Sequence, residues 1–165
     1  MHRVRIYQGN IAKLAVDAVV QAVDERSAIS AYQQPPLSLA VGQGFQADPS
    51  AAVHCAVGEV RVIAASSAMF FHTVCPVWRG GDQGEEQRLA LCYQQVMQRV
   101  KQENLRSIAF PSIGVEIGGF PARRAIKIAV QEVTVALAQN PFLESVSLCC
   151  ADPVTAALYR SHIGK

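Results

Sequence analysis

Residues 108–121 read IAFPSIGVEIGGFP and contain the kinds of residue that a site for an anion needs. The apolar start predicts a short buried strand, the glycines predict a loop, and Pro121 predicts the first position of a helix. A loop that ends at a helix N-terminus directs backbone N–H groups outward and adds the partial positive charge of the helix dipole. We therefore expect an anion-binding loop, in which Glu116 places a negative charge where a phosphate would sit.

Three further segments rich in Gly, Asn, Asp and Pro follow apolar runs, at residues 9–10, 21–24 and 76–81. Because apolar strands alternate with amphipathic helices, we predict a three-layer α/β/α sandwich on a mixed, largely parallel central sheet. In such sheets ligands bind beyond the carboxyl ends of the strands. We therefore expect these three segments and the 108–121 stretch to share one crevice.

Hydrophobic periodicity predicts which elements position this crevice. Alternation predicts a half-buried outer strand at residues 3–8, and a continuous apolar run predicts a central strand at 17–23. Further strands are expected at 59–64, 68–74, 106–110 and 146–150. Helices are expected at 85–103, from Pro121 onward and at 153–162, with one turn at 11–15, a loop at 24–36 and a short helix at 37–47. We expect one domain over residues 1–165.

Composition excludes several classes of function. Half of the residues are hydrophobic, 17% are charged and the net charge is +2, so we expect neither nucleic acid nor a membrane as a partner. The start of the chain has no apolar run that would form a signal peptide or membrane span. The five cysteines lack zinc-type spacing, and we expect buried thiols in a reducing cytoplasm, without metal or cofactor.

Five segments carry recognisable motifs. They are residues 8–11 and 17–24 (QGNI and DAVVQAVD, similar to Q-G-D-I and D-A-I-V-N-A-A-N), 55–59 (CAVGE, similar to C-x-T-G-x), 72–81 (HTVCPVWRGG, similar to H-T-V-G-P-V-W-R-G-G) and 108–121 (similar to I-A-F-P-A-I-S-T-G-V-Y-G-Y-P). Together these segments resemble the macro domain family across nearly the whole chain. The segment at 72–81 points to the subgroup of O-acetyl-ADP-ribose deacetylases and ADP-ribosyl hydrolases.

The resemblance implies a macro domain fold and a site for ADP-ribose or a related nucleotide. The nucleotide-binding residues carried over by the motifs are Asn10, Ile11, Gln21, Asp24, Ser112, Gly114, Val115, Glu116, Ile117, Gly118, Gly119 and Phe120. The family's Asp that holds the adenine amino group falls at Asn10, an acceptor without charge. Its two Asn fall at Gln21 and Asp24, and the second of these is the one expected to hold the distal ribose.

The departures from the family motifs affect catalysis most. Residues 29–39 contain neither the family's glycines nor the Asp that positions the catalytic water. Asp24 is the remaining candidate for a catalytic carboxylate. In the second loop, Glu116 replaces a family glycine and Gly118 replaces the aromatic residue expected to cover the ribose. The resemblance therefore implies a kept scaffold with a degenerate active site.

Several residues have simpler structural interpretations. Glu116 is either an exposed loop residue or a built-in anion at the helix N-terminus, where Arg123 and Arg124 would oppose the dipole without a partner. Asp24 also suits a strand end, and Asn10 also suits a cap.

The remaining candidates also have simpler structural interpretations. His72 fits a core histidine, and Cys75 an inert thiol. Trp78 and Arg79 either rim the pocket or form an aromatic–arginine surface contact. The cluster of Arg123, Arg124 and Lys127 is either a solvated face or a phosphate clamp.

Three functions remain open. The first is a divergent macro domain that binds ADP-ribose or a related nucleotide, weakly or with altered specificity, and without hydrolysis. The second is a hydrolase of the O-acetyl-ADP-ribose deacetylase or ADP-ribosyl hydrolase type. The third is an interaction scaffold that has lost its nucleotide. We favour the first, because an enzyme needs a water-positioning carboxylate that the motifs do not place.

Overall fold

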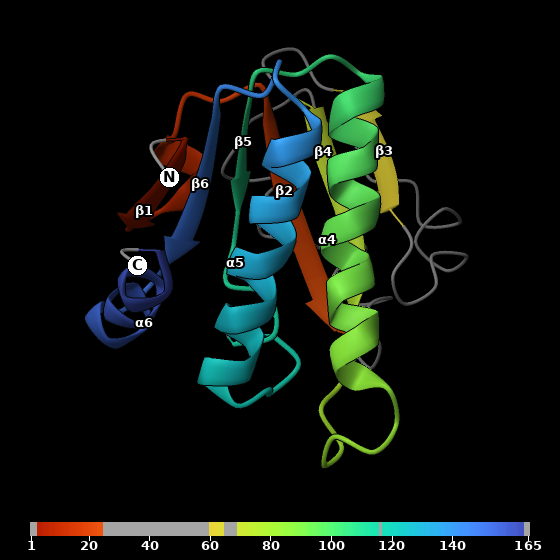
Figure 1. Ribbon diagram of the computed structural model, residues 1–165, viewed down its shortest axis with the longest axis vertical. Coiled ribbons are helices and arrows are strands. Elements are labelled where there is room, and N and C mark those ends of the chain that lie inside the picture. Colours follow the sequence, from red (N-terminus) through yellow and green to blue (C-terminus); the bar gives the residue numbers. More distant parts are fainter. Residues whose placement is uncertain (1–2, 25–59, 65–68, 116, 164–165) are drawn as a thin grey trace.

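The computed structural model describes residues 3–24, 60–64, 69–115 and 117–163 (Figure 1). Its elements follow the alternation that the sequence predicts. In chain order they are β1 (Val4–Gln8), the 3-10 turn η1 (Ile11–Lys13), β2 (Ala18–Asp24), β3 (Val60–Ala64), β4 (Met69–Cys75), α4 (Glu85–Gln102), β5 (Ser107–Phe110), α5 (Ala122–Gln139), β6 (Ser145–Cys150) and α6 (Pro153–Ile163).

The six strands form one sheet in the order β1-β6-β5-β2-β4-β3. Every neighbouring pair is parallel except β3 and β4, which are antiparallel. The prediction of a mixed, largely parallel sheet is therefore confirmed. So is the placement of β1 at an edge and of β2 in the interior, where Val19 pairs with Phe70 on one side and Ala109 on the other.

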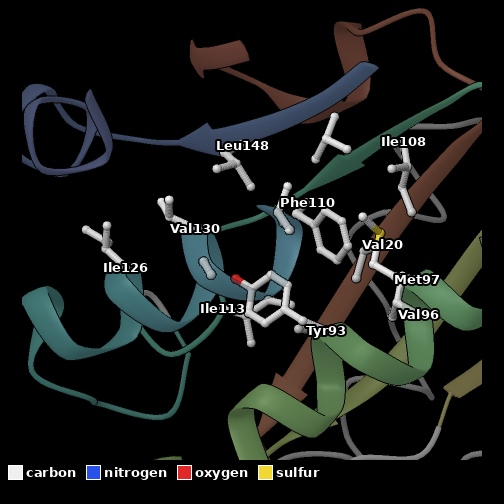
Figure 2. Close-up of a cluster of buried hydrophobic side chains, with 14 of the residues drawn as sticks. Val20, Tyr93, Val96, Met97, Ile108, Phe110, Ile113, Ile126, Val130 and Leu148 are labelled. Atoms are coloured by element: carbon white, nitrogen blue, oxygen red, sulfur yellow. The ribbon is translucent and has the colours of Figure 1, made fainter. Parts of the chain in front are cut away.

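Helices α4 and α5 lie side by side across the sheet, and α6 lies beside β1 and β6 (Figure 1). Beneath them Tyr93 of α4 packs on Phe110 of β5, with ring centroids 5.1 Å apart (Figure 2). Successive residues of β2 point to opposite faces, and both Val19 and Val20 are buried. A sheet buried on both faces is the middle layer of a sandwich, as the sequence predicts.

Helices α4 and α5 each bury an apolar face whose residues recur at helical spacing. The buried residues of these faces are Leu89, Cys92, Val96, Val100, Ile126, Ala129, Val130, Val133 and Leu137. Several predicted boundaries are wrong by one or two residues, and the one at the start of α5 has a clear structural reason. Pro121 has a ψ of 128°, which is extended, so it is the N-cap of α5 and Ala122 is the first helical residue. Asp24, predicted as the first residue of a loop, is instead the last residue of β2. The rest of the predicted loop at 24–36 and the predicted helix at 37–47 lie outside the described residues.

The carboxyl ends of the five parallel strands lie at the same edge of the sheet, as expected. Two backbone bonds join neighbouring segments there. The Gly9 N–H donates to the Cys150 carbonyl at 3.0 Å, and the Trp78 N–H donates to the Gly118 carbonyl at 2.8 Å. Within the described residues, no helix is long and apolar enough to cross a membrane.

Candidate nucleotide site

The 112–120 loop leads from β5 into α5. Its backbone is folded on itself, because the Val115 N–H donates to Ser112 O at 3.2 Å and the Phe120 N–H donates to Gly114 O at 2.8 Å. The first turn of α5 contains no acidic residue, and Arg123 lies in it exposed. The described part of this loop therefore ends at a helix N-terminus whose partial positive charge no acidic residue of α5 offsets.

Gly118 sits against the end of β4. A Cβ atom added there would lie 2.7 Å from the Pro76 carbonyl oxygen and 2.9 Å from Cys75 Sγ, and its φ is +98°. Both the contact and the backbone conformation require glycine. An aromatic side chain, which the family motif has at this position, does not fit this backbone, so the departure is a consequence of how the loop packs on β4.

The loop between Trp78 and α4 is built around one side chain. The Glu85 carboxylate is buried and accepts the N–H groups of Arg79 (2.7 Å), Gly81 (2.9 Å) and Gln83 (2.6 Å). Burial raises the pKa of Glu85, but these N–H bonds outweigh it and hold the pKa at about 2, below its ordinary 4.5. This loop therefore contains its own anion.

Trp78 connects the two loops. Its indole ring lies 5.2 Å from the Phe120 ring, and the Arg124 guanidinium lies 5.5 Å from its centroid. Arg124 also pairs with Glu86 at 3.2 Å. Of the two interpretations of this region, an aromatic–arginine contact is present, and Arg124 forms it.

Asn10 and Ile11 follow β1 after one intervening residue, Gly9, at the edge shared by the carboxyl ends. Asn10 is exposed, and Ile11 is half-buried at the start of η1. Gln21 is different, because it is buried within β2 and its Oε1 has no hydrogen-bond partner among the described residues. Asp24 is the last residue of β2 and pairs in register with Cys75.

Within the 112–120 loop, two of the predicted residues use their side chains for packing. Ser112 is buried and donates its hydroxyl to Cys149 O at 2.8 Å, while Phe120 is buried against Trp78. Val115 and Ile117 are half-buried, and Gly119 is exposed. Glu116 lies outside the described residues, and so does the 29–39 segment. The structure therefore brings the loop next to Trp78.

The other titratable candidates are buried. His72 is 1% exposed, and burial lowers its pKa from 6.5 to about 4, so it is neutral at pH 7. This fits a core histidine. Cys75 is fully buried, with Sγ 3.3 Å from Pro76 O and 3.5 Å from Ile117 O. Among the described residues, no group of three or more His, Cys, Asp or Glu could hold a metal ion.

Sequence reasoning missed Glu85. Glu85 is the first residue of α4, and hydrophobic periodicity predicts it only as the start of a helix. Its signal is a glutamate just after Gly80, Gly81 and Gly84, three glycines with positive φ. Such glycines allow a short loop to curl around a carboxylate and direct several N–H groups at it.

The family model of the Macro domain matches residues 36–129. The chain belongs to the macro domain family. A curated relative, a macro domain-containing protein of Methanosarcina mazei, is 33% identical over 90% of this chain and 81% of its own length. The O-acetyl-ADP-ribose deacetylase of Klebsiella pneumoniae (strain 342) is 37% identical over 92% of this chain and 91% of its own.

Solved macro domains share the fold. The Trypanosoma brucei macrodomain in complex with ADP-ribose superposes with a TM-score of 0.76 at 22% identity, covering 98% of this chain and 69% of the other. The Oceanobacillus iheyensis macrodomain with ADP gives 0.75 at 22% identity, covering 96% and 88%. The resemblance and the fold class inferred from the sequence are thus confirmed. The assignment of individual site residues stays a prediction.

Proposed function

We propose that this macro domain binds ADP-ribose or a related nucleotide, weakly or with altered specificity, and does not hydrolyse it. The observation that carries the proposal is the 112–120 loop. Its glycines hold a folded backbone beyond the end of β5, and it leads into an α5 N-terminus without an acidic residue in its first turn. Backbone N–H groups and a helix dipole together suit a diphosphate.

The predicted residues suit the parts of such a ligand. Asn10 and Ile11, after β1, are proposed to contact the adenine, and Asp24, at the end of β2, the distal ribose. The diphosphate is assigned to the loop, with its backbone rather than the buried Ser112 and Phe120 side chains making contact. Two solved macro domains with this fold contain ADP-ribose or ADP, which supports the class of ligand.

Hydrolysis is left out of the proposal because residues 29–39 contain no carboxylate to position water. One observation favours an enzyme instead, namely the 37% identity to a protein named O-acetyl-ADP-ribose deacetylase. In that case Asp24 is the candidate catalytic group. The third alternative is a scaffold that binds no nucleotide.

Calorimetric titration with ADP-ribose and a thermal shift measurement test the proposal. At a ligand concentration of about one hundred times Kd, binding stabilises the fold by roughly 2.7 kcal/mol, which raises Tm by roughly 5–10 °C for a chain of this size. No heat and no Tm shift at millimolar ADP-ribose would exclude ADP-ribose as the ligand. Turnover of O-acetyl-ADP-ribose that is lost in Asp24→Ala would establish the enzyme instead.

A matched pair of variants locates the site. Added Cβ atoms at Gly119 and Gly80 meet nothing within 4 Å, and their φ values are +72° and +99°. Gly119→Asp and Gly80→Asp therefore add the same charge with similar backbone strain to different loops. We expect only Gly119→Asp to abolish ADP-ribose binding, because it repels a diphosphate in the 112–120 loop. Equal loss in both variants argues against this placement.

A further inference from the structure

Glu85 holds the backbone of the loop that packs on Trp78. Its carboxylate binds the N–H of Arg79, the residue after Trp78, and the N–H of Gly81. Gly81 in turn lies against the indole, because a Cβ added there would be 2.9 Å from Trp78 Cη2 and 3.3 Å from Cζ2. The carboxylate thus holds the backbone that packs on one part of the indole.

The other contacts of Trp78 belong to the 112–120 loop and to α5. The backbone N–H of Trp78 donates to Gly118 O at 2.8 Å. Its indole ring packs against Phe120 and lies beneath the Arg124 guanidinium. Gly118 and Phe120 are both buried. A displacement of Trp78 therefore shifts the loop proposed to hold the diphosphate, while the Glu85 carboxylate is hydrogen-bonded to the backbone of Arg79, Gly81 and Gln83.

We propose that Glu85 is a positioning residue for nucleotide binding: by holding the 79–83 backbone around its carboxylate, it seats Trp78 against Gly118 and Phe120 and so sets the shape of the 112–120 loop. This inference rests on the proposed binding of ADP-ribose by that loop. Through this packing, the N-terminus of α4 contributes to the affinity for ADP-ribose, although it lies outside the predicted ligand contacts.

The first test is Glu85→Gln, which keeps the side-chain length but replaces one acceptor oxygen with an NH2 group. Trp78 is the single tryptophan of the chain, so its fluorescence reports on this junction alone. We expect a shifted Trp78 emission, faster hydrogen exchange of the amides in residues 114–120, and an ADP-ribose Kd raised about five- to tenfold. The control is Glu103→Gln, at the exposed C-terminal end of the same helix.

A second pair of variants tests the contact between the loop before α4 and Trp78 without changing Glu85. Gly81→Ala pushes on the indole, whereas Gly80→Ala, at a similar φ, has open space around its Cβ. We expect Gly81→Ala alone to shift the Trp78 emission and to weaken ADP-ribose binding. This pair also decides the matter if Glu85→Gln fails to fold, because both glycine variants carry the same backbone strain.

The outcomes separate the two proposals. Wild-type protein that gives no heat with ADP-ribose overturns the proposed binding of ADP-ribose, while the exchange rates of residues 114–120 still decide whether Glu85 positions the loop. Wild-type protein that binds with the same Kd as Glu85→Gln and Gly81→Ala overturns the positioning role and leaves the proposed function standing. Unchanged loop exchange in Glu85→Gln overturns it as well.

Discussion

Two glycine-bearing loops precede the two long helices, and they are stabilised differently. The loop before α4 wraps three backbone N–H groups around the carboxylate of Glu85. The 112–120 loop before α5 closes instead through backbone bonds, such as Phe120 N–H to Gly114 O, and through contact with β4. The first turn of α4 contains Glu85 and Glu86, whereas the first turn of α5 contains no acid.

This difference separates a loop that contains its own anion from the loop that we propose binds a ligand. N–H groups that already bind a carboxylate are not available to a phosphate. An α5 N-terminus without an acidic first turn retains its attraction for an external anion. The two loops meet at Trp78, so the loop before α4 packs against the 112–120 loop through this residue.

The largest expected effect tests how the 112–120 loop packs. Gly118→Ala should lower the free energy of unfolding by about 2–4 kcal/mol, because it combines a strained positive φ with overpacking against Pro76 and Cys75. Urea unfolding measures this. Gly119→Ala, with open space around its Cβ, should cost only about 1 kcal/mol. Equal losses would mean that close packing on β4 does not define this loop.

The next effect concerns the loop before α4 and depends on pH. The folded pKa of Glu85, about 2, lies below its ordinary 4.5, so its carboxylate stabilises the fold above pH 4.5. That contribution is lost as the pH falls toward 2. Glu85→Gln should therefore have a lower Tm than wild type at pH 7, and the gap should narrow as the pH falls toward 2. A gap that does not change with pH would show that the charge is not what holds the loop.

A smaller effect is expected at the junction. Arg124→Ala removes an exposed ion pair with Glu86 and a contact with the Trp78 ring, together about 1 kcal/mol. Thermal unfolding and Trp78 fluorescence should both change. Arg123→Ala is the neighbouring control, because Arg123 forms no ion pair with another described residue and should cost under about 0.5 kcal/mol. If the two variants behave alike, the Trp78 contact contributes nothing.

The smallest effect tests whether the 112–120 loop also contains a built-in anion. Glu116→Gly should tighten ADP-ribose binding about two- to fivefold if the carboxylate competes for the α5 N-terminus, since such a charge contributes about 0.3–1 kcal/mol. Calorimetry measures the change. If wild type binds as tightly as the variant, Glu116 does not act as a built-in anion. The 112–120 loop then differs in this respect from the loop before α4.

Much of the fold was predictable because each element carries a local signal. The apolar run of β2 indicated an interior strand, and the spacing of Leu89, Val96 and Val100 indicated the buried face of α4. The start of α5 was misplaced by one residue because proline fixes φ but not ψ, and the extended ψ of Pro121 places it at the N-cap. The candidate site was predictable only as a set of strand ends.

Residue types and their order in the chain thus determined the elements, the parallel sheet and the edge at which the candidate site lies. Only the tertiary structure decided that Gly118 must be glycine, since its neighbours are the Pro76 oxygen and the Cys75 sulfur. It also decided that Arg124, from α5, lies over Trp78. The physical reason is that periodicity reports which residues share a face, whereas a contact between two loops depends on how the strands that end in them are placed side by side.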